Sequence, residues 1–288
     1  MGLSKPSVEF TLRLYKEGFF KGFKSVIELG AQDFHFQPRQ KLYELLQQKL
    51  DIDQGIIVNE FNKALEKSTA DDFHPDWFYH LLGFEMYRCI DADGRHDAFV
   101  WDLNFPIPDE HKGKYDLVTD HGTSEHVFNV YQAFKNIHDL AHKSSVIIQM
   151  LPFQGHVDHG FFNFQPCFFE DLAFENDYEI LKKAVVIYHV EDNAESAQII
   201  PYTKESFKET YFQDKGSEAI FAIAMRRRTN KDFKIPFHGI YGSSCLIPFY
   251  RRSFIQSWFQ KLAVILLKNK NSVVRKIAKL AKKILEKN

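Results

Sequence analysis

The 288-residue sequence predicts an α/β protein built on a doubly wound, mostly parallel seven-stranded sheet with helices on both faces. Short apolar runs that suit buried strands alternate with segments whose apolar residues recur at helical spacing. Several of these runs stop at a group of polar residues, as expected where a parallel sheet carries a ligand site. The seven expected strands are Ser25–Leu29, Met86–Ile90, Ala98–Leu103, Tyr115–Thr119, Val146–Leu151, Val185–His189 and Ala219–Met225.

The helices are expected between and before these strands. Residues 7–21 and Phe128–His142 have apolar residues on one helical face. The gap between the first two strands is too long for one helix, so about 34–82 is predicted to be a helical insert. Within it, Gln40–Leu50 and Asn59–Glu66 have helical patterns.

The charge distribution divides the chain. From Arg251 onward there are 11 Lys or Arg residues and one acid, whereas the rest has an excess of acids. We therefore expect a domain at 1–235, a linker at 236–250 and a basic helical extension at 251–288. The pattern over 254–288 is that of amphipathic helices, which could lie on an anionic membrane or pack on the domain or a second subunit, as in a homodimer.

The bulk properties exclude several classes of protein. The three widely spaced cysteines favour no disulfide framework or zinc site, and they fit a reducing cytoplasm. The longest apolar run, at 262–267, is far shorter than a membrane span. No nucleic-acid-reading motif is present. The expected location is cytoplasmic, with peripheral contact to the inner face of the membrane through the basic extension.

Acidic residues follow the first expected strands. Gly30 closes the first strand in "ELGAQD", Asp91 follows the second, and Asp102 lies in the third. A carboxylate at the end of the second strand can accept both hydroxyls of a ribose. In dinucleotide-binding folds this acid comes about 20 residues after the glycine turn, so the helical insert accounts for the longer gap here.

The segments "SVIELGAQD", "YRCIDADG", "FVWDLNFPIP" and "YDLVTDHGTSEHV" together resemble class I S-adenosylmethionine-dependent methyltransferases, which share a Rossmann-like fold. The resemblance covers about residues 20–230 and is strongest at 25–33 and 115–127. "GTSEHVFN", "LPFQGHVDHGFFNFQPCFF" and "DLAFEN" are similar to a bacterial subgroup of that family. The sequence departs from the family pattern at Gln32, where a second glycine is usual.

The resemblance implies a cofactor, S-adenosylmethionine, with S-adenosylhomocysteine as the product. It implies methyl transfer to an oxygen or nitrogen of a small molecule or glycan, and the basic extension hints at a cell-envelope sugar. Asp120 would lie near the methyl group, and Ser124 or Thr123 would cap the next helix. The residues implied to bind the cofactor are Glu28, Gly30, Gln32, Asp91, Asp102, Leu103, His121 and Gly122.

A hydroxyl acceptor must lose a proton, and histidine can take it near neutral pH. His156 and His159 follow the fifth expected strand, and we predict them as catalytic residues together with Asp120. Asp158 or Asp120 would orient His159. The same histidines could instead only fix a loop. A metal site from His156, Asp158 and His159 is disfavoured by their spacing, so no metal is expected.

Two further interpretations concern the insert and the function. The aromatic residues of the insert, including Trp77 and Phe78, could form a wall of the acceptor pocket. A non-catalytic, membrane-associated binding protein on the same fold remains the alternative function, because the glycine turn is incomplete. A nicotinamide-dependent oxidoreductase is disfavoured by the missing glycine fingerprint.

Overall fold

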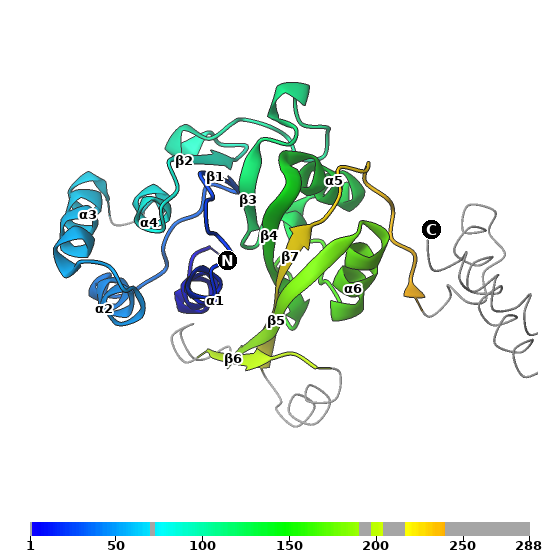
Figure 1. Ribbon diagram of the computed structural model, residues 1–288. Helices are drawn as coiled ribbons and strands as arrows, with labels where there is room; N and C mark the ends of the chain where they lie inside the picture. The colour runs from blue at the N-terminus through cyan, green and yellow to red at the C-terminus, as the bar shows by residue number, and fades with distance from the viewer. Residues whose placement is uncertain (1, 70–72, 190–196, 204–216, 240–288) are drawn as a thin grey trace, which may run out of the picture. The chain divides into compact units, whose positions relative to one another are not determined.

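The computed structural model describes residues 2–69, 73–189, 197–203 and 217–239 (Figure 1). The chain divides into two compact units, Met1–Pro236 and Phe237–Asn288. The predicted linker at 236–250 lies mostly outside the described residues, and the basic extension at 251–288 lies wholly outside them. Among the described residues no helix is both long and apolar enough to cross a membrane.

The first unit contains the predicted seven-stranded sheet, in the order β2-β1-β3-β4-β7-β5-β6. The pairs β1–β2, β1–β3 and β3–β4 are parallel, and β7 runs antiparallel to both of its neighbours. Five strands therefore point in one direction. The strands are β1 (Ser25–Leu29), β2 (Met86–Ile90), β3 (Tyr115–Asp120), β4 (Ala141–Gln154), β5 (Tyr178–His189), β6 (Gln198–Pro201) and β7 (Ser217–Arg227).

The predicted strand Ala98–Leu103 is wrong. Only Phe99 pairs with the sheet, through an isolated parallel bridge to Ile90. The backbone then turns, because the N–H of Trp101 donates to the carbonyl of Phe99 at 2.9 Å instead of continuing the ladder. The seventh strand is β6, which pairs antiparallel with residues 184–187 of β5 and was not predicted.

Helices cover both faces of the sheet, as predicted (Figure 1). Because side chains alternate along a strand, Val26 packs towards one face and Ile27 towards the other. The first face is covered by α1 (Lys5–Lys16), α2 (Gln40–Lys49), α3 (Gln54–Lys67) and α4 (Asp76–Leu81), and the second by α5 (Val130–Leu140) and α6 (Pro166–Glu175).

The segment between β1 and β2 is helical and contributes to the core. Its helix α3 begins at Gln54, five residues before the predicted start, after Asp53 accepts a hydrogen bond from the Gly55 N–H. Trp77 and Phe78 of α4 are 5% and 0% exposed and pack against Phe34. They therefore form core rather than the wall of an acceptor pocket, which corrects that prediction.

Candidate functional site

The glycine turn after β1 has a conformation that only glycine adopts easily. Gly30 has a φ of +80°, and a Cβ there would lie 2.4 Å from Gln32 Nε2 and 2.6 Å from Thr123 Oγ1. The Gln32 side chain donates to the Leu29 carbonyl and to Thr123 Oγ1, at 3.1 and 3.2 Å. Gln32 therefore fills the turn and links it to the loop after β3.

Asp91 lies where β2 ends and reaches the same turn. Its Oδ2 accepts a hydrogen bond from the Ala31 N–H at 2.8 Å, and its Oδ1 accepts from the Asp93 N–H at 3.3 Å. Arg95 pairs with Asp93 and with Asp33, each at 2.8 Å. The loops after β1 and β2 are thus joined by charge-assisted hydrogen bonds.

Glu28, predicted to bind the cofactor, is fully buried in a hydrogen-bond network. Its carboxylate accepts from the hydroxyls of Tyr79 and Tyr87, at 3.0 and 2.7 Å, and from Thr119 at 3.3 Å. Burial raises the pKa of Glu28 to about 7, and the hydroxyl donors only partly oppose this. Both carboxylate oxygens are therefore engaged by the protein itself.

Asp102 and Leu103 lie in the turn that replaces the predicted third strand. Asp102 is exposed, and hydrogen bonds from the backbone and side chain of Asn104 lower its pKa. Leu103 is 7% exposed and belongs to the core on the α5 side. Asn136 holds this turn in place by donating to the carbonyls of Leu103 and Phe105.

Asp120 ends β3 and organises the loop that follows. It is fully buried and accepts from the N–H groups of Thr123 and Ser124, from the Ser124 hydroxyl at 2.6 Å, and from Gln149 at 3.4 Å. Burial raises its pKa. These contacts give Asp120 a positioning role for the loop that carries His121.

His121 is the other buried polar group at this strand end. It is 1% exposed, and neither ring nitrogen has a hydrogen-bond partner among the described residues. Burial lowers its pKa to about 4, so the ring is neutral at physiological pH. Gly122 follows with a φ of +91°. The N–H of Gly2 donates to the His121 carbonyl at 3.2 Å, so the N-terminal segment lies against this loop.

The helix after this loop begins later than predicted. Ser124–His126 form a separate short 3-10 helix, and Asn129 caps α5 by accepting from the Gln132 N–H. Ser124 cannot cap α5, because its hydroxyl is committed to Asp120. The short 3-10 helix places Glu125 inside the protein and His126 at its surface.

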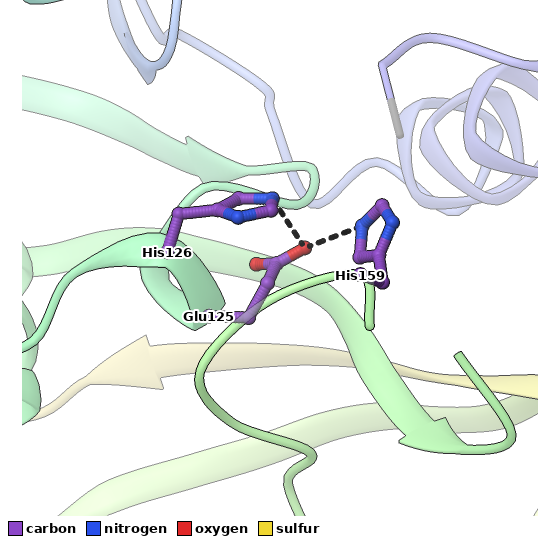
Figure 2. Close-up of side chains that lie close together, drawn as sticks. All are labelled: Glu125, His126 and His159. Atoms are coloured by element: carbon purple, nitrogen blue, oxygen red, sulfur yellow. Dashed lines mark ion pairs between the residues drawn. The ribbon is translucent and has the colours of Figure 1, made fainter. Parts of the chain in front are cut away.

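Glu125 lies between two histidines, His126 and His159 (Figure 2). Its Oε1 is 3.8 Å from His126 Nε2 and 3.6 Å from His159 Nε2. The Glu125 side chain is 0% exposed, and neither of its oxygens has a hydrogen-bond donor in the described part of the chain. Burial raises the pKa of Glu125 to about 8. The carboxylate beside His159 is therefore Glu125, whereas Asp158 or Asp120 was predicted.

The loop after β4 brings the second predicted histidine to the same region. The His156 N–H donates to Glu218 Oε1 at 3.0 Å, and its Nδ1 lies 3.6 Å from Glu218 Oε2. The His156 and His159 rings are 5.5 Å apart, and burial lowers the pKa of both. His156 is 7% exposed, whereas the His159 side chain is 32% exposed.

Sequence reasoning missed Glu125 as a site residue and expected it in the first turn of the next helix. The loop after β4 buries this side chain, because Phe161 and Phe162 donate their N–H groups to the Glu125 carbonyl. Gly160 makes this approach possible, since a Cβ there would lie 3.0 Å from Glu125 Cγ. In the sequence, only Gly160, which follows His156 and His159, indicated that another segment packs closely against this loop.

No protein-family model and no curated protein matches the sequence. Among solved structures, it is similar to an S-adenosylmethionine (SAM)-dependent methyltransferase from Archaeoglobus fulgidus, with 12% identity, a TM-score of 0.37, and coverage of 76% of this chain and 93% of that one. It is also similar to the 1,6-didemethyltoxoflavin-N1-methyltransferase of Burkholderia thailandensis, solved with 1,6-didemethyltoxoflavin and S-adenosylhomocysteine. That match has 10% identity, a TM-score of 0.35, and coverage of 76% and 78%.

A third similar structure is described as the [4+2]-cyclase SpnF, with 10% identity, a TM-score of 0.37, and coverage of 78% of this chain and 82% of that one. Two of these three proteins are thus described as methyltransferases and one as a cyclase. Scores at this level carry no argument about the function of this chain, which must come from its own residues.

Proposed function

We propose that the chain is an S-adenosylmethionine-dependent methyltransferase acting on an oxygen or nitrogen of a small molecule or glycan. The observation that carries this proposal is the meeting of three strand ends at the glycine turn. Asp91 after β2 is bonded to the turn after β1, and Thr123 of the loop after β3 donates to the Leu29 carbonyl at 2.9 Å. The sequence resemblance described above supports the same assignment.

The residues at this edge fit the cofactor. Gly30 makes the tight turn with its positive φ, Asp91 has the charge and position to accept ribose hydroxyls, and His121 has two buried ring nitrogens without partners among the described residues. Asp102 and Leu103 would meet the adenine, and His121 with Gly122 the methionine end. Glu28 would act indirectly, by fixing β1 through its tyrosine contacts.

For methyl transfer, the protein mainly has to position the acceptor beside the methyl group and remove a proton from it. A bond forms between the acceptor oxygen or nitrogen and the methyl carbon, the carbon–sulfur bond of the cofactor breaks, and the acceptor proton leaves. His159 is the more exposed of the two loop histidines and would take that proton. His156, held by Glu218, and the buried Asp120 would position the two loops.

Exposed aromatic side chains beside this region suit a ring-shaped acceptor. Phe128 and Phe161 are 75% and 66% exposed, and their rings meet edge to face at 6.0 Å. A glycan of the cell envelope, brought close by the basic extension at the inner face of the membrane, would combine these features. That extension lies outside the described residues, so this part rests on the sequence.

Titration calorimetry with S-adenosylmethionine and S-adenosylhomocysteine tests the proposal. We expect micromolar binding that Asp91→Ala abolishes. Asp91→Asn keeps an acceptor for the Ala31 N–H but loses the charge, so it should also bind much more weakly. Asp109→Ala is the matched control, because this exposed acid pairs with Lys112 in the segment before β3. Absence of binding to folded wild-type protein would refute the proposal.

A second candidate function is a non-catalytic binding protein on the same fold. The observation that favours it is Gln32, whose side chain fills the glycine turn where the cofactor's methionine end would lie. Gln32→Gly separates the two functions. If Gln32 excludes the cofactor, this variant gains binding that the wild type lacks. If Gln32 contacts the cofactor, the variant loses affinity.

A further inference from the structure

The cluster of Glu125, His126 and His159 has an arrangement that neither a hydrogen-bond network nor core packing explains. The buried Glu125 carboxylate has no hydrogen-bond donor among the residues that the structure describes. A buried carboxyl without a charged partner keeps its proton, and a cation that displaces this proton can take its place. The Nε2 atoms of His126 and His159, at 3.8 and 3.6 Å, are too far away to donate hydrogen bonds to it.

We propose that Glu125, His126 and His159 bind a divalent transition-metal ion. One ligand atom from each residue lies within 4.8 Å of the other two. Metal–nitrogen and metal–oxygen bonds of about 2.1 Å place neighbouring ligand atoms about 3 to 3.5 Å apart, so small side-chain rotations complete the site. Figure 2 shows the carboxylate between the two imidazoles, which both turn a nitrogen towards it.

The backbone around the site is already fixed. The Glu125 carbonyl accepts from Phe161 and Phe162, which ties the 3-10 helix to the loop that carries His159. A Cβ at position 160 would lie 3.0 Å from Glu125 Cγ and 3.3 Å from His126 Cε1, so Gly160 allows the two segments to approach closely. Two sequence-distant segments are therefore held in register, and little conformational freedom would be lost when the ion binds.

The ligand set indicates which ions fit. Two imidazoles and one carboxylate suit Zn²⁺, Co²⁺, Mn²⁺ or Fe²⁺, whereas Mg²⁺ and Ca²⁺ prefer oxygen ligands. The His126 and His159 side chains are 45% and 32% exposed, so the remaining coordination positions face outward. An open position on that side would be available to water or to an oxygen or nitrogen of an acceptor.

The use of such an ion in catalysis rests on the proposed methyl transfer, whereas the site itself does not. His159 Nε2 cannot hold a metal and accept a proton at once. A metal there would lower the pKa of a bound hydroxyl so that its proton could pass to water, and His159 would not be needed as the base. This predicts a metal-dependent methyl transfer in which His159 is a ligand rather than the proton acceptor.

Binding of Co²⁺ to the full-length, untagged protein tests the site. After treatment with EDTA and gel filtration, calorimetry and the visible absorption of Co²⁺ should show one equivalent bound more tightly than about 10 µM. Glu125→Gln and His159→Ala should each weaken this binding by at least about 100-fold. His142→Ala is the matched control, because His142 is similarly exposed and pairs with Asp116 elsewhere.

Glu125→Gln keeps the shape of the side chain but cannot become an anionic ligand, so it should keep the fold, which circular dichroism checks. Equal Co²⁺ affinity in Glu125→Gln, His159→Ala and the wild type would overturn the proposal, as would no binding by the wild type. S-adenosylhomocysteine binding is measured on the same metal-free samples. Cofactor binding without Co²⁺ binding refutes the metal site alone, and Co²⁺ binding without cofactor binding refutes only the proposed function.

Discussion

The buried Glu28 carboxyl should make the stability of the protein depend on pH in a way that one substitution removes. Glu28 is fully buried between Tyr79 and Tyr87, and its pKa rises from 4.5 to about 7 on folding. The folded protein therefore holds this proton more tightly than the unfolded chain. Its contribution favours folding at low pH and is lost as pH rises from about 4.5 to about 7.

The size of the effect follows from the pKa difference. Each pKa unit corresponds to about 1.4 kcal/mol, so the full change is about 3 kcal/mol, of which about 2 to 3 kcal/mol falls between pH 5 and pH 8. Urea unfolding of the wild type and of Glu28→Gln at both pH values isolates this residue, because other titrating groups cancel in the difference. Relative to the wild type, the variant should be more stable at pH 8 than at pH 5 by that amount.

The direction in which the stability difference changes with pH is the most decisive part of the test. A paired carboxylate with a depressed pKa would produce the opposite trend, with the variant relatively less stable at pH 8. A pH-independent difference between the two proteins would also refute the reasoning, since it would mean that Glu28 titrates alike in both states. Tyr87→Phe provides a second check, because loss of one hydroxyl donor should raise the Glu28 pKa further.

Three further predictions concern stability and can be measured by urea unfolding. Gly30→Ala should destabilise the protein by about 2 to 4 kcal/mol and weaken cofactor binding. Gly83→Ala, which has a similar positive φ but open space around it, should lose only about 1 kcal/mol. Arg227→Met should lose about 3 kcal/mol because four backbone carbonyls lose their donor, whereas exposed Arg228→Met should change stability by less than about 1 kcal/mol. Asn136→Ala should lose about 2 kcal/mol by releasing the turn that follows β2.

Elements whose signal is local were predictable. Ser25–Leu29 and Met86–Ile90 were predicted with the observed ends, because each is a short run between turn residues. Ala98–Leu103 has an equally good strand pattern, and yet it turns after one bridge. That turn forms because the Trp101 N–H donates to the Phe99 carbonyl instead of to a neighbouring strand. The amino-acid composition does not show which of these two hydrogen bonds forms.

The location of the candidate site could be predicted from the sequence, whereas the roles of its individual residues were harder to predict. The strand ends do bring Gly30, Asp91 and the loop of His121 together, as parallel topology requires. The role of each carboxylate depends instead on what packs over it. Nothing local distinguishes Glu28, which two tyrosines hold, from Glu125, whose side chain has no hydrogen-bond partner among the described residues.

The contrast between the Glu28 and Glu125 carboxyl groups supports the proposed cation site at Glu125, His126 and His159. Both are fully buried, and both have raised pKa values. For Glu28 the fold supplies three hydroxyl donors, so its burial is complete without any further partner. For Glu125 the fold supplies two imidazoles just beyond hydrogen-bond reach, and both are open to solvent. The Glu125 carboxyl instead faces two histidines, and this arrangement of three ligand groups is what supports the proposed cation site.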